Sequence, residues 1–160
     1  MNPYRIQGNW KQRRRIAIAA ALTLGLAAPT GAGAGFLSST GPVIAILGGE
    51  LFVGEAEGHL SGAGTIAIHS QRVPSLACAG DFTSSAALGG SGQLHCSDGT
   101  AARFRFTRLS IFNGHGSGSF SRGPMSFAYG LTAEEAAPYL TLPDGKKLVR
   151  EGTELALVDL

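Results

Sequence analysis

Apolar and polar residues alternate along most of the chain from about residue 42 onward. In TIAIHS, Ile66 and Ile68 fall on one face of an extended strand, whereas Thr65, Ala67 and His69 fall on the other. This two-residue period is typical of β-strands that bury one face. Related runs are GELFVGEAEGHL, PMSFAYG and KLVREGTELALVDL; GPVIAIL is an expected first strand, and turns such as SGAG and SDGT separate the strands. We therefore predict an all-β fold, an antiparallel meander of about eight strands that forms a small barrel or sandwich.

One predicted strand, ARFRFTRLSIF, changes the face on which its apolar residues lie. Phe104 and Phe106 share one parity, whereas Leu109 and Ile111 have the other. Because a regular strand would place one of these pairs on the wrong face, we predict a β-bulge near Thr107.

With that bulge, the arginines of the strand all lie opposite its apolar residues. Arg103, Arg105 and Arg108, with Arg122 as a further member, could then form a local anion contact. The alternative is an ordinary solvated face, whose charges discourage pairing with other strands.

A short helix interrupts the strand pattern in LTAEEAAPYL. Thr132, followed three residues later by Glu135, is typical of a capping box at the start of a helix. We predict one short helix near residues 133–137, which Pro138 ends or distorts.

The segment FNGHGSGSFSRGP contains three glycines at alternating positions, from Gly114 to Gly118. On a strand, Gly114, Gly116 and Gly118 share one face, which carries no side chains. Such a face admits a bulky side chain, a neighbouring backbone or the surface of a partner, and we treat it as a candidate partner-contact face. A phosphate-binding loop is not expected, because another strand rather than a helix follows.

The chain begins with a basic segment, a short apolar run from Ile16 to Ala28, and small residues up to Ala34. This order is typical of a secretory signal peptide, which we assign to residues 1–34. The apolar run is shorter than the ~20 residues that a membrane-spanning helix needs. The alternative is a retained anchor that contacts the inner membrane through residues 16–36. Residues 35–160 are expected to form a single exported β domain, which is either periplasmic or secreted.

The chain has only two cysteines, Cys78 and Cys96. In an oxidising compartment such a pair is expected to form one disulfide. A hairpin in which Cys78 faces Cys96 and Gly80 faces Leu94, with a turn near Ala87, would bring them together. A redox or metal-binding pair is the alternative, but the C-x-x-C spacing is absent.

The net charge of the whole chain, +2, depends on the basic residues of the N-terminal segment. Without residues 1–34 the chain has more acidic than basic residues. Because nucleic-acid binding relies on clustered lysine and arginine, we do not expect a nucleic-acid partner.

Residue patterns for catalysis or metal binding are weak. The four histidines, His59, His69, His95 and His115, are widely spaced and are expected to be solvated, so no metal site or cofactor is predicted. GHGSGS lacks the strand–turn–helix context of a nucleophile elbow. We therefore expect a protein that binds and does not catalyse a reaction.

Four spaced motifs are similar to those of an uncharacterised group of small exported proteobacterial β-proteins. They are C-x-G from Cys78, G-x-G-x-x-x-C-x-D-G from Gly90, F-x-F from Phe104, and F-x-Y-G-L-T from Phe127. The likeness extends from about Gly49 to Leu142. It implies export and a β fold, and it implies no activity and no site residues.

Two functions remain from the sequence. The first is a non-catalytic accessory or scaffolding component that docks on another protein of the bacterial envelope or of a membrane complex. The second is a small barrel that binds a lipid or another apolar ligand between its aromatic residues, Phe104, Phe106, Phe127 and Tyr129. The simplest role of these aromatic side chains is an ordinary core.

Overall fold

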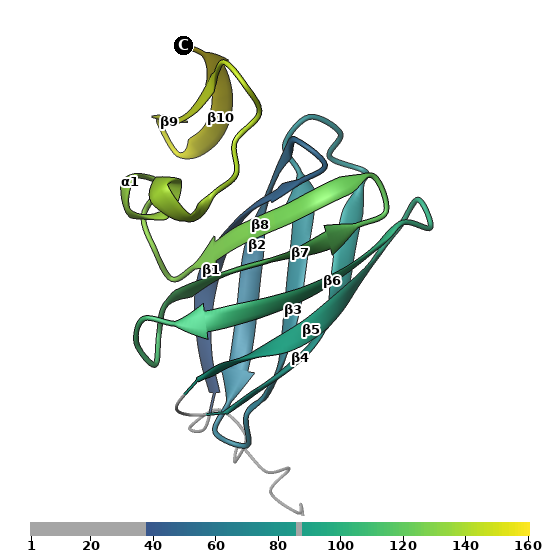
Figure 1. Cartoon of the computed structure of the whole chain (residues 1–160), viewed down its shortest axis with the longest axis vertical. Coiled ribbons are helices and arrows are strands. Elements are labelled where there is room, and N and C mark those ends of the chain that lie inside the picture. The colour runs from purple at the N-terminus through teal and green to yellow at the C-terminus, as the bar shows by residue number, and fades with distance from the viewer. Residues whose placement is uncertain (1–37, 86–87) are drawn as a thin grey trace, which may run out of the picture. The chain divides into compact units, whose positions relative to one another are not determined.

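The protein folds as a closed antiparallel barrel followed by a short helix and a separate hairpin (Figure 1). This structure is a computed structural model, and it describes residues 38–85 and 88–160. The signal peptide or anchor expected for residues 1–34, and the turn expected near Ala87, lie outside the described residues.

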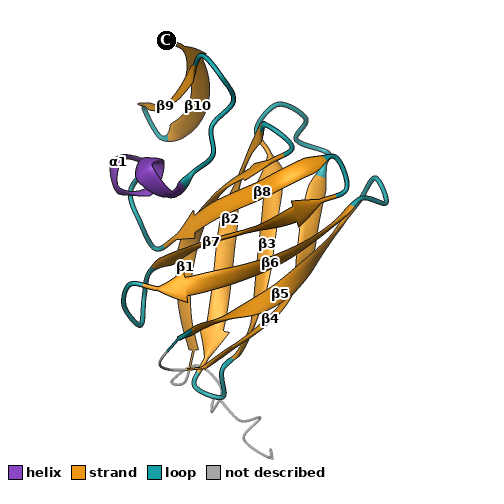
Figure 2. Ribbon diagram, viewed as in Figure 1, coloured by secondary structure: helices purple, strands orange, loops and turns teal. Residues whose placement is uncertain are grey.

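Eight strands form the barrel, each paired with the next, and the last pairs with the first. Figure 2 shows them in orange, joined by loops at the two ends of the barrel. The all-β meander is thus confirmed, and of the two predicted closures it adopts the barrel. The strands are β1 (Ser38–Leu47), β2 (Glu50–His59), β3 (Ala63–Ser70), β4 (Ala77–Ser85), β5 (Gly89–Cys96), β6 (Ala101–Arg108), β7 (Gly114–Phe120) and β8 (Gly123–Tyr129).

Every second residue of the strands points into the barrel interior, as their alternating pattern requires. Ile66 and Ile68 are buried, and Cys78 pairs with Cys96 across β4 and β5 in the predicted register. The two cysteines form a disulfide, as predicted. The apolar cluster consists mainly of Val43, Ala45, Leu47, Phe52, Ile66, Ile68, Cys78, Leu94, Cys96, Ala102, Phe104, Phe106, Phe120, Met125 and Phe127.

The predicted helix is present and covers part of the outside of the barrel. It comprises α1 (Ala133–Ala136) and a 3₁₀ turn, η2 (Ala137–Tyr139), which contains Pro138. The capping box is complete, because Thr132 accepts a hydrogen bond from the backbone of Glu135 while the Glu135 carboxylate accepts one from the backbone of Thr132.

The last two strands, β9 (Lys146–Glu151) and β10 (Glu154–Asp159), form the expected terminal hairpin as a sheet of their own. Their leucines pack against a second apolar cluster, together with α1. That cluster includes Ile44 and Ile46 on the outer side of β1 and Ala128 on the outer side of β8. The second half of β1, from Val43 to Leu47, is therefore buried on both faces, which explains why this stretch is continuously apolar instead of alternating.

The β-bulge predicted near Thr107 is wrong. Strand β6 pairs residue by residue with β7 as far as Arg108, which lies opposite Gly114. The strand ends there, and Leu109 and Ile111 lie exposed in the following loop, with 50% and 69% of their surfaces accessible. The change of parity therefore marked the end of the strand, beyond which side chains no longer have to alternate between the inner and outer faces of the sheet.

Candidate functional site

A cavity of about 670 Å³ occupies one end of the barrel interior. This volume lies within the ~300–1,000 Å³ typical of small-molecule sites. The cavity extends to the end at which β1 begins and β2, β4 and β6 end, and the loops after β2 and β6 contribute to its rim. We call this end the mouth and the opposite end the base.

Aromatic side chains form the deep wall of the cavity. Phe104, Phe106, Phe127 and Tyr129, the four residues singled out from the sequence, all line it, together with Phe82. Their rings meet edge to face: the ring centroids lie 5.1 Å apart for Phe104 and Phe127, and 5.9 Å apart for Phe106 and Tyr129. The structure thus brings the four residues together: Phe104, Phe106 and Phe127 belong to the apolar cluster of the interior, Tyr129 packs against it, and all four also face the cavity.

The glycines of β7 lie against these rings. Gly116 is buried, and a β-carbon there would lie 2.5 Å from the ring of Phe127 and 2.3 Å from a backbone oxygen of β6. At Gly114 a β-carbon would clash with the Tyr129 hydroxyl at 2.6 Å, and at Gly118 it would clash with backbone of β6 at 2.0 Å. The glycine face is therefore covered by bulky side chains and backbone of the chain itself. A partner surface has no access to it at Gly114 and Gly116.

The predicted anion cluster is divided between the two sides of the barrel wall. Arg103 and Arg105 are exposed on the outer face, where Gln93 and Ser91 of β5 lie directly opposite them. Arg108 instead continues the inward parity of Phe104 and Phe106 and lines the cavity. The interpretation of three arginines on one face was therefore wrong, for the same reason as the bulge.

Arg108 is the only Arg, Lys, Asp or Glu side chain among the described residues that line the cavity. Its Nη2 atom donates a hydrogen bond to Ser84 Oγ at 2.6 Å. Its Nε atom is buried and has no hydrogen-bond partner within the described part of the chain. Burial raises the pKa of the nearby Tyr129 hydroxyl, and the positive charge of Arg108 acts in the opposite direction.

Exposed apolar side chains surround the mouth. We call them the apolar rim; they come from three loops and are Leu60, Leu88, Leu109, Ile111 and Phe112. Leu60 and Leu88 each have 81% of their surface accessible. Ile111 and Phe112 also line the cavity, so the rim and the interior form a continuous apolar surface.

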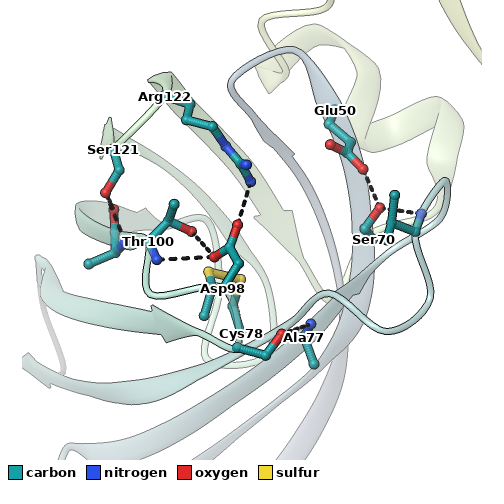
Figure 3. A network of polar contacts seen from close by, with 12 residues as sticks. Glu50, Ser70, Ala77, Cys78, Asp98, Thr100, Ser121 and Arg122 are labelled. Atoms are coloured by element: carbon teal, nitrogen blue, oxygen red, sulfur yellow. Dashed lines mark hydrogen bonds and ion pairs between the residues drawn. A yellow bond between two sulfur atoms is a disulfide. The ribbon is translucent and has the colours of Figure 1, made fainter.

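The base is closed by the disulfide and by polar contacts (Figure 3). The Ser70 hydroxyl is fully buried, donates to Glu50, and accepts hydrogen bonds from the backbone of Arg72 at 3.1 Å and Val73 at 2.9 Å. Burial tends to raise the pKa of Glu50, but its hydrogen bonds with Arg72 and Ser70 outweigh this and hold the pKa below its ordinary value.

A second group of contacts at the base joins the turn after β5 to the turn after β7. Asp98 accepts hydrogen bonds from the side chain and backbone of Thr100 and forms an ion pair with Arg122 at 3.0 Å. Hydrogen bonding to Thr100 lowers the pKa of Asp98, and Arg122 adds to this effect. These turns are held by their own side chains, as compact β-turns require.

The histidines have separate surroundings. His59 lies at the rim of the cavity, and His115 stacks on Tyr139 of η2 with ring centroids 4.1 Å apart. Among residues 38–85 and 88–160, no three His, Cys, Asp or Glu side chains are placed to share a metal ion. No helix in these ranges is long and apolar enough to span a membrane.

Comparison with known proteins gives no further assignment. A scan against protein-family models, a search of curated proteins and a search of solved structures each found no match. The site is therefore interpreted from its own geometry. Sequence reasoning missed the inward position of Arg108, although the shared parity of Phe104, Phe106 and Arg108 was a signal that could have found it.

Proposed function

We propose that this protein binds a small apolar molecule inside the mouth of its barrel, without converting it chemically. The observation that carries this proposal is the cavity of about 670 Å³ lined by six phenylalanine and tyrosine side chains. Transfer of apolar surface from water to such a site is favourable by ~25 cal/mol per Å². Ligand pockets of this kind are lined mainly by apolar and aromatic side chains, with a few polar groups that fix the orientation of the ligand.

The arrangement of the mouth supports the entry of such a ligand. The apolar rim is continuous with the cavity, so a ligand entering from a lipid phase or from another protein would remain in contact with apolar surface. The disulfide supports an oxidising compartment, in agreement with the proposed location in the periplasm or outside the cell.

A cavity-filling variant tests the proposal. A β-carbon at Gly58 would meet only the Phe82 ring, at an ordinary 3.8 Å, so Gly58→Leu extends into the cavity without a backbone clash. We expect it to abolish binding of 1-decanol, measured by isothermal titration calorimetry, while the thermal midpoint changes little. Ala67→Leu, on the exposed outer face of β3, is the matched control and should bind as the unmodified chain does.

The opposite result would reject the proposal. If the unmodified chain binds no alkyl compound, or if Gly58→Leu binds 1-decanol as well as the control does, the cavity is not a ligand site.

A second candidate function is docking on another envelope protein, and the apolar rim favours it. Exposed apolar groups gathered in one place mark interaction sites more often than groups scattered singly. Replacing Ile111 and Phe112 with serine should then remove a stoichiometric partner that co-purifies from native membranes. Such loss with unchanged 1-decanol binding would favour docking, whereas loss of alkyl binding with no partner found would favour the ligand barrel alone.

A further inference from the structure

We propose that the ligand is a single-chain amphiphile with a carboxylate headgroup, which pairs with Arg108 at the mouth while the alkyl chain lies among the aromatic rings. This inference rests on the proposed function and specifies the chemical class of the ligand. It would make the protein a binder of fatty-acid-like molecules.

The first argument is the position of Arg108. It is the last residue of β6, two residues beyond Phe106, and it points to the same interior. A molecule whose apolar part contacts Phe104 and Phe106 would therefore place its outer end beside the guanidinium group. The Ser84 hydroxyl accepts from Arg108 and already donates to the backbone oxygen of Gly62, so it holds the guanidinium group in place. Ser61 and Ser85 also line the cavity, and a serine hydroxyl can donate to an anionic oxygen.

The second argument is the incomplete set of partners of Arg108. A guanidinium group has five N–H donors, and the described residues provide one hydrogen bond, from Nη2 to Ser84 Oγ. The buried Nε atom is left without an acceptor. No Asp or Glu is among the described residues that line the cavity. Charged groups with buried atoms are normally paired, so this partly buried arginine fits an anion that the ligand supplies.

The third argument concerns the kind of anion. A carboxylate matches the planar donor fork of arginine with two parallel hydrogen bonds. It carries one negative charge, which corresponds to the single arginine, with no lysine, among the described lining residues. A phosphate monoester would bring close to two charges at neutral pH and leave one of them without a partner.

The test compares two ligands of equal chain length on the full chain, decanoate and 1-decanol, by isothermal titration calorimetry at neutral pH. We expect decanoate to bind at least about tenfold more tightly, the size of effect that a charge-assisted hydrogen bond gives. This comparison needs no variant, so it holds even if a substitution disturbs folding.

A pair of substitutions on the same strand then assigns the effect. Arg108→Gln should weaken decanoate binding about tenfold or more and weaken 1-decanol binding much less, because the alcohol has no charge for the guanidinium group to pair with. Arg105→Gln, on the exposed outer face of β6, is the matched control and should change neither. Circular dichroism verifies that both variants fold.

The outcomes separate this inference from the proposed function. If both ligands bind equally, or if Arg108→Gln and Arg105→Gln behave alike, the carboxylate assignment is overturned while the apolar cavity stands. If neither ligand binds to the unmodified chain, the proposed function fails and this inference fails with it.

Discussion

The mouth and the base of the barrel are formed by different kinds of side chains and contacts. At the base, a disulfide, ion pairs and hydroxyl groups join neighbouring turns, and Ser70 satisfies two backbone amides in a fully buried position. At the mouth, aromatic rings line a cavity and apolar side chains are exposed in the loops. One arginine there has a buried nitrogen with no hydrogen-bond partner among residues 38–85 and 88–160. The difference indicates that the base maintains the fold and leaves the mouth free to keep a space that a ligand can occupy.

The largest expected effect comes from removing the covalent bond at the base. Replacing both Cys78 and Cys96 with alanine should lower the free energy of unfolding by about 3 kcal/mol, because the bridge closes a loop of 18 residues. Urea denaturation would measure this loss. Because the mouth has its own contacts, the folded fraction should still bind 1-decanol; loss of binding from correctly folded protein would contradict the separation of the two ends.

The next effect concerns the glycine face behind the aromatic wall. Gly116→Val should cost about 2–3 kcal/mol, since its side chain would overlap both the Phe127 ring and the backbone of β6. His115→Ala, the neighbouring outward residue, should cost about 1 kcal/mol or less, the value of its stacking on Tyr139. Thermal denaturation of the two variants compares them directly. Equal losses would show that the inner face of β7 is not tightly packed.

A smaller effect is expected from the hydroxyl group at the base. Ser70→Ala should destabilise the protein by about 1–2 kcal/mol, because it leaves two backbone amides without their acceptor and removes a hydrogen bond to Glu50. Denaturant unfolding measures it. Ser61→Ala, at the rim, is the control and should be nearly neutral, since that hydroxyl is exposed and makes one long contact of 3.4 Å. A large loss at Ser61 would contradict the comparison of the two ends.

The smallest expected effect is a dependence of stability on pH. The pKa of Glu50 is lower in the folded protein than its ordinary value of 4.5. Its contribution is therefore fully present above about pH 4.5 and is lost as the pH falls through the folded-state pKa. Glu50→Gln should flatten the fall in thermal midpoint below this pH. An unchanged profile would mean that Glu50 does not contribute to acid sensitivity.

Local sequence patterns predicted much of the fold. Alternation identified the strands, the Asp98–Gly99 turn and the cysteine pair set the register of their hairpins, and Thr132 with Glu135 located the helix. The closure of the barrel was left open because the pairing of β1 with β8 joins distant segments, and no local pattern encodes it. The double burial of β1 depends in the same way on the helix and hairpin that follow much later in the chain.

The candidate site was predicted only in part. The four aromatic residues were identified because alternation places them on the inner face of their strands. Whether space remains beside them depends on the curvature of the closed barrel, which no local sequence pattern encodes. Arg108 was misplaced because Leu109 and Ile111 were assumed to belong to its strand. In the structure these residues lie beyond the strand end, in the apolar rim.

The central claim, that the mouth binds an apolar ligand while the base supports the fold, can be tested most directly by nuclear magnetic resonance. Amide shifts of the full chain would be followed during titration with decanoate. The account predicts that the largest changes occur at Phe104, Phe106, Arg108 and Tyr129, with little change at Ser70 and Asp98. Changes centred on the base, or no saturable change at all, would contradict it.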